Sequence, residues 1–312
     1  MKIKRRAALK KTSKALGFTF IPSYLATGAR AEGDPQPPSK RINLGCVGVG
    51  GRAGGVIPGL CGKGNAQPVA FADVDYSARN VEKNLKRWPG VKQYADFREM
   101  MDKSGRDIDA VSVVVPDHSH FCATILAMSM GKHVYVEKPC SHNVREGRLM
   151  IEAARRNKRV MQVGTQSRST KHVMKAMELL HNGAIGRVLV AKAWNSQKRS
   201  SIGKAAPSAP PSHLDFETWL GPASKLPYQR NMLHGIWRWW RAFGTGDMGN
   251  DGVHDLDIAR WGLGVTTHPR RIAALGGKYF FDDDLQFPDT QVCGLEYGIL
   301  YQVVVLPFRY QS

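Results

Sequence analysis

Short apolar runs and longer amphipathic segments alternate along the first half of the chain. We expect strands near residues 42–49, 67–73, 110–115, 133–137 and 160–164. Between them, apolar residues recur at helical spacing, notably over Ser119–Met130 and Asn143–Asn157. Such alternation of strand and helix is typical of a parallel sheet with helices on both faces. Residues 41–165 are therefore predicted to form a doubly wound α/β domain.

The pattern changes after Gly164, which predicts a second domain over residues 166–312. Its expected elements are a helix at Lys171–His181, a strand at Val188–Trp194, a loop at Ser196–Ser212, a helix at Gly252–Gly262 and a hairpin turning at Tyr297-Gly298. The alternating tail favours a domain built on a sheet. The aromatic cluster Trp237–Trp240 is expected to pack in the core or at the domain interface, although one tryptophan could stack on a sugar ring.

A glycine-rich turn follows the first predicted strand. Gly48, Gly50 and Ala53 fit the G-x-G-x-x-G/A spacing of dinucleotide-binding turns. The first glycine permits the turn, the second lets the backbone approach a pyrophosphate, and the small third residue lets helix and strand pack closely. The second strand ends at Asp73, which can accept hydrogen bonds from a ribose diol. A structural turn with Asp73 as a helix N-cap is the alternative, but the strand before and the helix after favour a dinucleotide site.

The segment HVYVEKP ends another predicted strand with an acid, a lysine and a proline. Val134 and Val136 mark the strand, and open α/β sheets bind ligands beyond the carboxyl ends of their strands. Glu137 and Lys138 are therefore expected to face that crevice, with the lysine where a nicotinamide ring would lie. A plain surface lysine is the less favoured alternative, because this one ends a strand and precedes a proline.

Composition fits a folded chain of about two domains. Of the 312 residues, 42% are hydrophobic and 23% are charged, which is ordinary, but the net charge is +19. Eight of the positive charges lie in residues 1–31, which contain no acid, and the remaining +11 is scattered without an RNA-binding motif. A solvated basic surface is therefore favoured over a nucleic-acid site.

The N-terminal segment has the layout of an export signal. A basic start with Arg5 and Arg6 precedes a mildly apolar stretch, Ala15–Leu25, and a small-residue cleavage site. The arginine pair indicates the Tat route, and the apolar stretch is too short to span a bilayer. We expect a Tat signal peptide over residues 1–31, a linker over residues 32–40 and an exported protein. A disordered basic tail is the alternative.

The cysteines and histidines do not predict a metal site or a disulfide framework. The five cysteines are odd in number and include no CxxC pair. The nearest approach to a metal cluster is Asp117–His120, which lacks matching ligands at a recognisable spacing. We expect this segment to be a loop that lines the crevice.

Taken together, the glycine turn, Asp73, the VPDHSH loop, EKP, the VGTQSR strand end and GNDGVHDLDIARW resemble the Gfo/Idh/MocA oxidoreductases over Ile42–Phe308. The exported branch of the family is resembled most closely. The resemblance implies a Rossmann domain that binds NAD or NADP, and a C-terminal α/β domain with an open, mostly antiparallel sheet. It also implies sugar, cyclitol or related alcohol substrates and self-association through that sheet. Because the family's sheet normally continues beyond the position of Ser312, a short or incomplete member is expected.

By the same resemblance, Lys138 is the catalytic lysine and Pro139 its proline, often in a cis peptide bond. A lysine there can stabilise developing alkoxide charge. His254 corresponds to the histidine that exchanges the hydroxyl proton; without the resemblance, a core or capping histidine would be preferred. Asn250 replaces an acid often found at that position, and Asp251 is no automatic substitute because adjacent helical residues point about 100 degrees apart. We therefore expect His254 alone to act as the general base.

The predicted cofactor site consists of Gly48, Gly50, Gly51, Arg52, Ala53, Asp73, Pro116, His118, His120, Glu137 and Lys138. NAD is preferred because Asp73 would repel a 2′-phosphate, although Arg52 and Arg79 keep NADP as a second candidate. Substrate contacts are expected from Gln166, Arg168 and Asp257, with packing at the domain junction as the alternative.

The favoured function is oxidation or reduction of a sugar-like alcohol or ketone with a nicotinamide cofactor. A glycosidase that uses tightly held NAD for transient oxidation is a second hypothesis, since the same fold supports both reactions. A non-catalytic sugar-binding protein is the third, favoured by Asn250 and by the position of the last residue. Net oxidation with free cofactor turnover would distinguish the first from the second.

Overall fold

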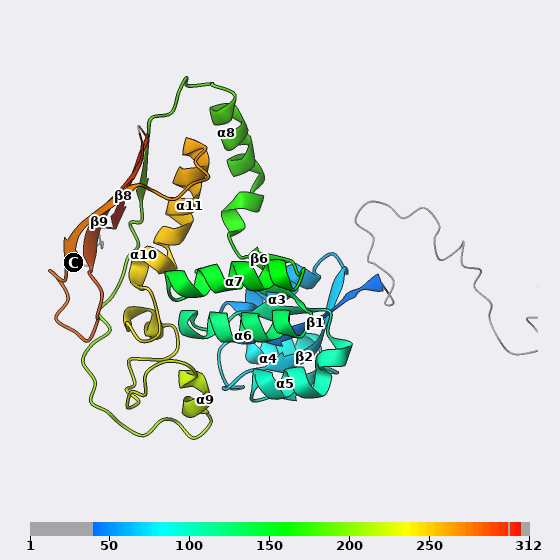
Figure 1. Ribbon diagram of the computed structural model, residues 1–312. Helices are drawn as coiled ribbons and strands as arrows, with labels where there is room; N and C mark the ends of the chain where they lie inside the picture. Colours follow the sequence, from blue (N-terminus) through cyan, green and yellow to red (C-terminus); the bar gives the residue numbers. More distant parts are fainter. Residues whose placement is uncertain (1–39, 299, 307–312) are drawn as a thin grey trace, which may run out of the picture.

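The computed structural model describes residues 40–298 and 300–306 (Figure 1). Its N-terminal half is built on a six-stranded parallel sheet in the order β3-β2-β1-β4-β5-β6. The strands are β1 (Ile42–Val47), β2 (Ala66–Ala72), β3 (Lys92–Tyr94), β4 (Ala110–Val113), β5 (His133–Val136) and β6 (Met161–Val163). The helices between them are α3 (Ala53–Cys61), α4 (Val81–Arg87), α5 (Phe97–Ser104), α6 (Asp117–Ser129) and α7 (Val144–Arg156). The predicted doubly wound sheet is confirmed.

The predicted signal peptide, residues 32–39 of the predicted linker and residues 307–312 lie outside the described residues.

Apolar layers cover both faces of the parallel sheet. On one face, Val111 and Val113 of β4 pack with residues of α5, α6 and α7. On the other, Phe71 of β2 packs with Ile57 of α3, and both side chains are fully buried. Burial of one such side chain contributes about 1.5–3 kcal/mol. Because both faces are covered, the strands read as nearly continuous apolar runs.

Two local features of this domain differ from the prediction. The strand expected at residues 42–49 ends at Val47, because Gly48 has a φ of +81° and turns the chain away from the sheet. Strand β3, at the edge of the sheet, had no counterpart in the sequence analysis. It is only three residues long, and its sequence, Lys-Gln-Tyr, has no apolar alternation.

The C-terminal half contains a four-stranded sheet in the order β7-β10-β9-β8. The strands are β7 (Val190–Trp194), β8 (Arg271–Gly277), β9 (Thr290–Tyr297) and β10 (Leu300–Leu306). Only β7 and β10 pair in parallel, so the open, mostly antiparallel sheet is confirmed. The hairpin expected at Tyr297-Gly298 is also confirmed, because Tyr297 pairs with Leu300 across the turn. Strand β8 had not been predicted.

Helix α11 (Gly252–Leu263) lies beside this sheet, and helix α8 (Lys171–His181) packs against α11 (Figure 1). Helix α11 packs against β7 and β10, and the buried Gln302 side chain donates to the carbonyl of Leu256 (2.9 Å). The strand register places a second set of residues on the opposite face: Val190, Trp194, Tyr301, Val292 and Leu275. All are exposed, Trp194 by 59% and Leu275 by 81%. We call this set the open face of the sheet.

The connection from β7 to α11 reaches back to the Rossmann domain. It contains α9 (Phe216–Leu220), the 3₁₀ helix η4 (Ile236–Trp239) and α10 (Gly246–Asn250). Its own apolar core includes Trp219, Trp240 and Phe243. The ring of His118, from α6, lies against Trp219 and Phe243, with centroids 5.2 and 5.3 Å away. This packing joins the two halves of the chain around one cavity.

Candidate active site

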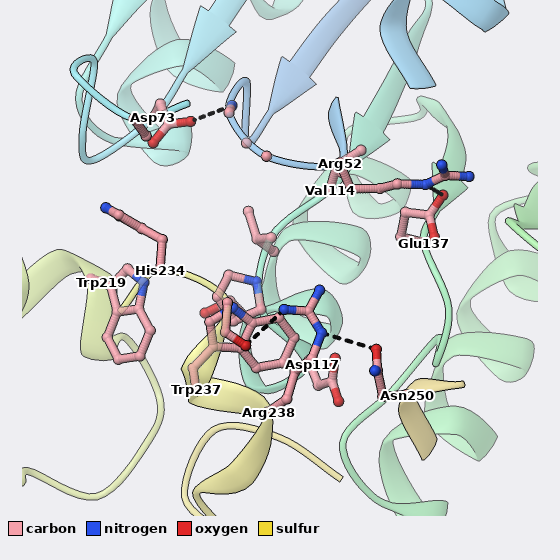
Figure 2. A pocket seen from close by; sticks show the side chains of 18 of the residues that line it. Arg52, Asp73, Val114, Asp117, Glu137, Trp219, His234, Trp237, Arg238 and Asn250 are labelled. Carbon is pink, nitrogen blue, oxygen red and sulfur yellow. Dashed lines mark hydrogen bonds and ion pairs between the residues drawn. The ribbon is translucent and has the colours of Figure 1, made fainter. Parts of the chain in front are cut away.

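A cavity of about 840 Å³ lies at the carboxyl ends of β1, β2, β4 and β5. The Rossmann side of its lining includes the glycine turn, Asp73, Asp117 and Lys138, and the second domain supplies the opposite wall. Figure 2 shows side chains from both domains converging on this space. The position is the one where open α/β sheets bind ligands, and the volume is typical of a site for a small molecule or cofactor.

The glycine turn has the geometry that its spacing predicts. A Cβ on Gly48 would lie 2.2 Å from the carbonyl oxygen of Val114, so no other residue fits there. Gly51 also has a positive φ, +50°, with open space beside it. Ala53 is fully buried at the start of α3. The turn therefore presents backbone at the N-terminus of a helix, where amide N–H groups and the helix dipole favour anions such as a pyrophosphate.

Asp73 follows β2 and accepts hydrogen bonds from this turn. Its Oδ2 accepts hydrogen bonds from the amides of Val49 (2.7 Å) and Gly50 (3.2 Å), and Oδ1 accepts from Asp75 N (3.1 Å). Burial raises the pKa of the carboxyl, and these amides oppose that rise. The N-cap alternative for Asp73 is wrong, because α4 begins only after Asn80.

Lys138 reaches across the cavity to the second domain. It follows β5, and its peptide bond to Pro139 is cis. Its Nζ donates to the backbone carbonyl of Asn250 and to Asn250 Oδ1 (3.1 Å). Burial lowers the pKa of the ammonium group, and the charge of Asp251 opposes this shift. The ammonium is therefore held in place by an acceptor that cannot take its proton.

Asn250 holds a second cation with the same oxygen. The Nε of Arg238 donates to Asn250 Oδ1 at 2.9 Å, which Figure 2 shows as a dashed line. Asp251, by contrast, forms an ion pair with Arg199, which also binds Asp247 at 2.6 Å. Asp251 thus lines the cavity, but its carboxylate is engaged by an arginine rather than by Lys138.

His254 lies in the first turn of α11 and lines the cavity. Among the described residues, its Nδ1 is buried without a hydrogen-bond partner. Burial lowers the pKa of the imidazole, and the nearby charge of Lys138 lowers it further. The ring is therefore neutral at physiological pH, and a neutral ring nitrogen can accept a proton.

His118 and His120 are placed away from the cavity lining, which corrects their expected role as cofactor contacts. His118 Nε2 lies 3.0 Å from the carbonyl oxygen of Trp219. His120 is fully buried, with Nδ1 2.7 Å from the carbonyl oxygen of Pro139, and burial lowers its pKa to about 4. Within the same segment, Pro116 does line the cavity, as do Asp117 and Ser119.

The remaining predicted residues separate into two groups. Gln166 lines the cavity and accepts a hydrogen bond from Arg52 (2.5 Å), whose Nε lies 3.6 Å from Glu137 Oε1. Arg168 and Asp257 do not line it. They bind each other through two hydrogen bonds of 2.7 and 2.8 Å, and the Arg168 guanidinium lies 5.0 Å from the Trp261 ring centre. Arg168 and Asp257 therefore fit the alternative role of packing at the domain junction and not the expected role of substrate contacts.

Asp117 and Arg238 are among the cavity residues that were not predicted as site residues. Asp117 is buried, which raises its pKa to about 6, and its Oδ2 accepts from Thr245 (2.8 Å). Arg238 stacks on Trp237, 4.3 Å from the ring centre. The signal for Asp117 was its position in a segment expected to line the crevice, although that segment is the first turn of α6 and not the predicted loop. Arg238 was hidden within an aromatic cluster assigned to packing.

Among residues 40–298 and 300–306, no group of three or more His, Cys, Asp or Glu side chains could hold a metal ion. None of the helices described there is long and apolar enough to cross a membrane.

The fold and the cavity define a dinucleotide-binding α/β protein, and comparison with known families agrees. Residues 42–165 match the NAD-binding Rossmann fold of an oxidoreductase family, and residues 170–275 match its C-terminal alpha/beta domain. The chain belongs to the Gfo/Idh/MocA oxidoreductase family.

Individual relatives are distant. The levoglucosan dehydrogenase of Pseudarthrobacter phenanthrenivorans is 25% identical over 232 residues, which cover 72% of this chain and 52% of that protein. A glycosyl hydrolase family 109 protein of Saccharopolyspora erythraea is 26% identical over 59% of this chain and 44% of its own length. The chain thus spans about half the length of these relatives. The WlbA dehydrogenase of Bordetella pertussis, solved with NADH and UDP-GlcNAcA, has the same fold, with a TM-score of 0.68 at 16% identity over 89% of this chain and 70% of that one.

Proposed function

We propose that this chain transfers hydride between a nicotinamide dinucleotide and a secondary alcohol or ketone of a sugar or cyclitol. The observation that carries the proposal is the convergence of Lys138 and His254 on one cavity whose other end is the glycine turn. The name of the levoglucosan dehydrogenase, which matches over 72% of this chain, supports a carbohydrate substrate.

The residues present fit a nicotinamide dinucleotide, which supplies the two-electron acceptor or donor when it is bound. The N-terminus of α3 would hold its pyrophosphate. Asp73 would accept hydrogen bonds from a ribose diol through the lone pairs that the amides leave available. Because this carboxylate would also repel a 2′-phosphate, we propose NAD rather than NADP as the preferred cofactor.

Lys138 and His254 would act on the oxygen of the substrate. When an alcohol is oxidised, a hydride leaves its carbon and a proton leaves its hydroxyl group, which yields a ketone. The Lys138 ammonium would stabilise the negative charge that develops on the oxygen. A ring nitrogen of neutral His254 would receive the proton. Asn250 would position the lysine without taking part in proton transfer.

The test is turnover with a panel of sugars and cyclitols. Purified protein is incubated with NAD or NADP and each compound, and formation of the reduced cofactor and of the keto product is measured together. We expect a ketone in equal amount to the reduced cofactor, with NAD favoured. Binding of a dinucleotide without oxidation of any compound in the panel would contradict the proposal.

A second candidate is a glycosidase that uses tightly held NAD. The match to a glycosyl hydrolase family 109 protein favours it, and Asp117, with a pKa raised to about 6, is a candidate for an acid group in the cavity. Cleavage of a nitrophenyl glycoside without net formation of NADH would support this candidate over the first.

We also propose export by the Tat route and self-association through the open face of the sheet. The export proposal is supported by Arg5 and Arg6 in the basic start of the sequence.

Self-association is supported by the apolar residues of the open face, such as Trp194 and Leu275, because their exposure to water costs free energy. Sedimentation velocity should show that the wild type forms an oligomer and that Leu275→Asp weakens this association. A monomeric wild type would contradict the proposed self-association.

A further inference from the structure

Arg238 differs from Arg52 and Arg199, two other arginines of the cavity lining, which both form ion pairs. It is partly buried in η4, where it donates through Nε to Asn250 Oδ1 (2.9 Å) and through one terminal nitrogen to the carbonyl of Gly235 (2.9 Å). No ion pair joins it to a carboxylate among residues 40–298 and 300–306, whereas Arg199 has two. A charge that leaves water is stabilised chiefly by a counter-ion. The guanidinium thus keeps one terminal nitrogen without a hydrogen-bond partner in the described part of the chain.

The carboxylates nearby do not bond to Arg238. Lys138 and Arg238 share the single neutral oxygen of Asn250. Asp247 and Asp251 are both bonded to Arg199, and Asp117, whose charge acts on Arg238, accepts its hydrogen bond from Thr245. A carboxylate on a ligand can therefore bind the N–H groups of the guanidinium that the described part of the chain leaves unbonded.

The geometry places that ligand group beside the reacting carbon. Arg238 Nε and Lys138 Nζ lie no more than 6.0 Å apart, because their bonds to the same oxygen are 2.9 and 3.1 Å long. In Figure 2 the third guanidinium nitrogen points away from Asn250, on the side of Arg52 and Val114 in this view. Stacking on Trp237 at 4.3 Å holds the group in orientation. An anion bound there and an oxygen bound by Lys138 can belong to one sugar ring.

We propose that Arg238 binds a carboxylate carried by the substrate, so that the chain acts on sugar acids in preference to neutral sugars. The inference rests on the proposed function for the reaction itself, and it adds the chemical class of the substrate. A planar guanidinium suits a carboxylate because two parallel N–H bonds can reach its two oxygens.

The experiment compares binding of matched sugar pairs without turnover. Wild type, Arg238→Gln and Arg241→Gln are saturated with NADH, so that no alcohol can be oxidised. They are then titrated by calorimetry with D-galacturonate, D-glucuronate, D-galactose and D-glucose. Arg241 is the matched control, because it is exposed in the same segment, bonds to Gln286 and does not line the cavity. The methyl ester of galacturonate, titrated into wild type, removes the ligand charge without changing the protein.

We expect wild type and Arg241→Gln to bind a uronate about 10- to 100-fold more tightly than the matched hexose, the range for one charge-assisted hydrogen-bonded pair. Arg238→Gln and the methyl ester should each abolish that preference. Equal affinity of wild type for uronates and hexoses, or no uronate binding, would overturn the inference. Weaker NADH binding by Arg238→Gln with an unchanged uronate preference would also overturn it, by assigning the guanidinium to a cofactor phosphate.

The proposed function is tested separately by NADH formation from the same four sugars. Uronates that bind through Arg238 but are never oxidised would support the inference and contradict the reaction. Oxidation of neutral hexoses as efficiently as of their uronates would support the reaction and contradict the inference.

Discussion

Asn250 determines how the cations of the site are arranged at the scale of single residues. Its side-chain oxygen accepts from Lys138 and from Arg238, at 3.1 and 2.9 Å. A carboxylate in the same place would neutralise one of these charges and could compete for the substrate proton. The amide does neither, so the lysine keeps its charge for the substrate oxygen, and His254 remains the group suited to accept the proton.

Replacement of Lys138 tests the electrostatic role. Lys138→Met should lower kcat by about 100- to 1,000-fold, the size expected when one preorganised donor to a developing oxyanion is lost. Affinity for the dinucleotide should change little, because the pyrophosphate and ribose contacts lie at the other end of the cavity. Steady-state kinetics and NADH titration measure the two effects. Lys83→Met, on the exposed surface of α4, is the control. Wild-type turnover in Lys138→Met would refute the mechanism.

The proton-accepting role of His254 predicts the pH dependence of the reaction. Because the pKa of His254 is lowered, the ring stays neutral below the ordinary value of 6.5 and loses its accepting form only in more acidic solution. The acid limb of kcat/KM for alcohol oxidation should therefore have its midpoint below pH 6.5. His254→Ala should remove this limb and lower kcat by about 100- to 10,000-fold. Persistence of the same limb in the variant would assign the proton to another group.

The sequence identified Lys138, Asn250 and His254 as residues of one site, because two family motifs carry them, EKP for the lysine and GNDGVHDLDIARW for the other two. It could not identify Arg238 or Asp117, since their importance depends on partners more than 10 residues away in the chain. Arg238 bonds to Asn250, 12 residues away, and Asp117 bonds to Thr245, 128 residues away. His118 failed in the opposite way: its segment, the first turn of α6, does reach the cavity, but its ring fills a gap between two aromatic side chains.

The glycine turn gives the sharpest test at the scale of an element. Gly48→Ala combines a positive φ with a Cβ placed 2.2 Å from a backbone oxygen, so the turn must shift. We expect a loss of at least about 2 kcal/mol in unfolding free energy and weaker dinucleotide binding. Gly59→Ala is the control. It lies in α3 with nothing within 4 Å of the added Cβ and should stabilise the helix by about 0.5–1 kcal/mol. Urea titrations measure the unfolding free energy of both variants. Equal changes in the two variants would refute the claim that the turn requires glycine at residue 48.

Strands could be predicted from the sequence where burial on both faces requires a continuous run of apolar residues. Strands β1, β4 and β5 are covered on both faces, and their continuous apolar runs were recognised. Strand β3 escaped because three polar residues at a sheet edge leave no periodic signal. Strand β8 escaped for a related reason. Six of its seven residues are exposed, so its sequence is not constrained by a core.

Export is a prediction for the whole molecule. Changing Arg5 and Arg6 together to Lys preserves the charge of the N-terminal segment but removes the pair that the Tat receptor reads. Precursor should then remain in the cytoplasm, as judged by cell fractionation and immunoblotting. Changing Lys10 and Lys11 to Arg serves as the control and should leave processing unaffected. Normal periplasmic processing of the Arg5/Arg6 variant would show that another signal is used.

The hydrogen bond between Lys138 and Asn250 also limits how such a chain can be recombined. The lysine is encoded with the cofactor-binding half, while its acceptor and His254 are encoded with the other half. A chimaera that exchanges the second half for that of a relative would change specificity and, in the same step, the anchor of the lysine. Engineering a new substrate preference is therefore better confined to wall residues such as Trp237 and Arg238, with Asn250 kept, than attempted by grafting whole domains.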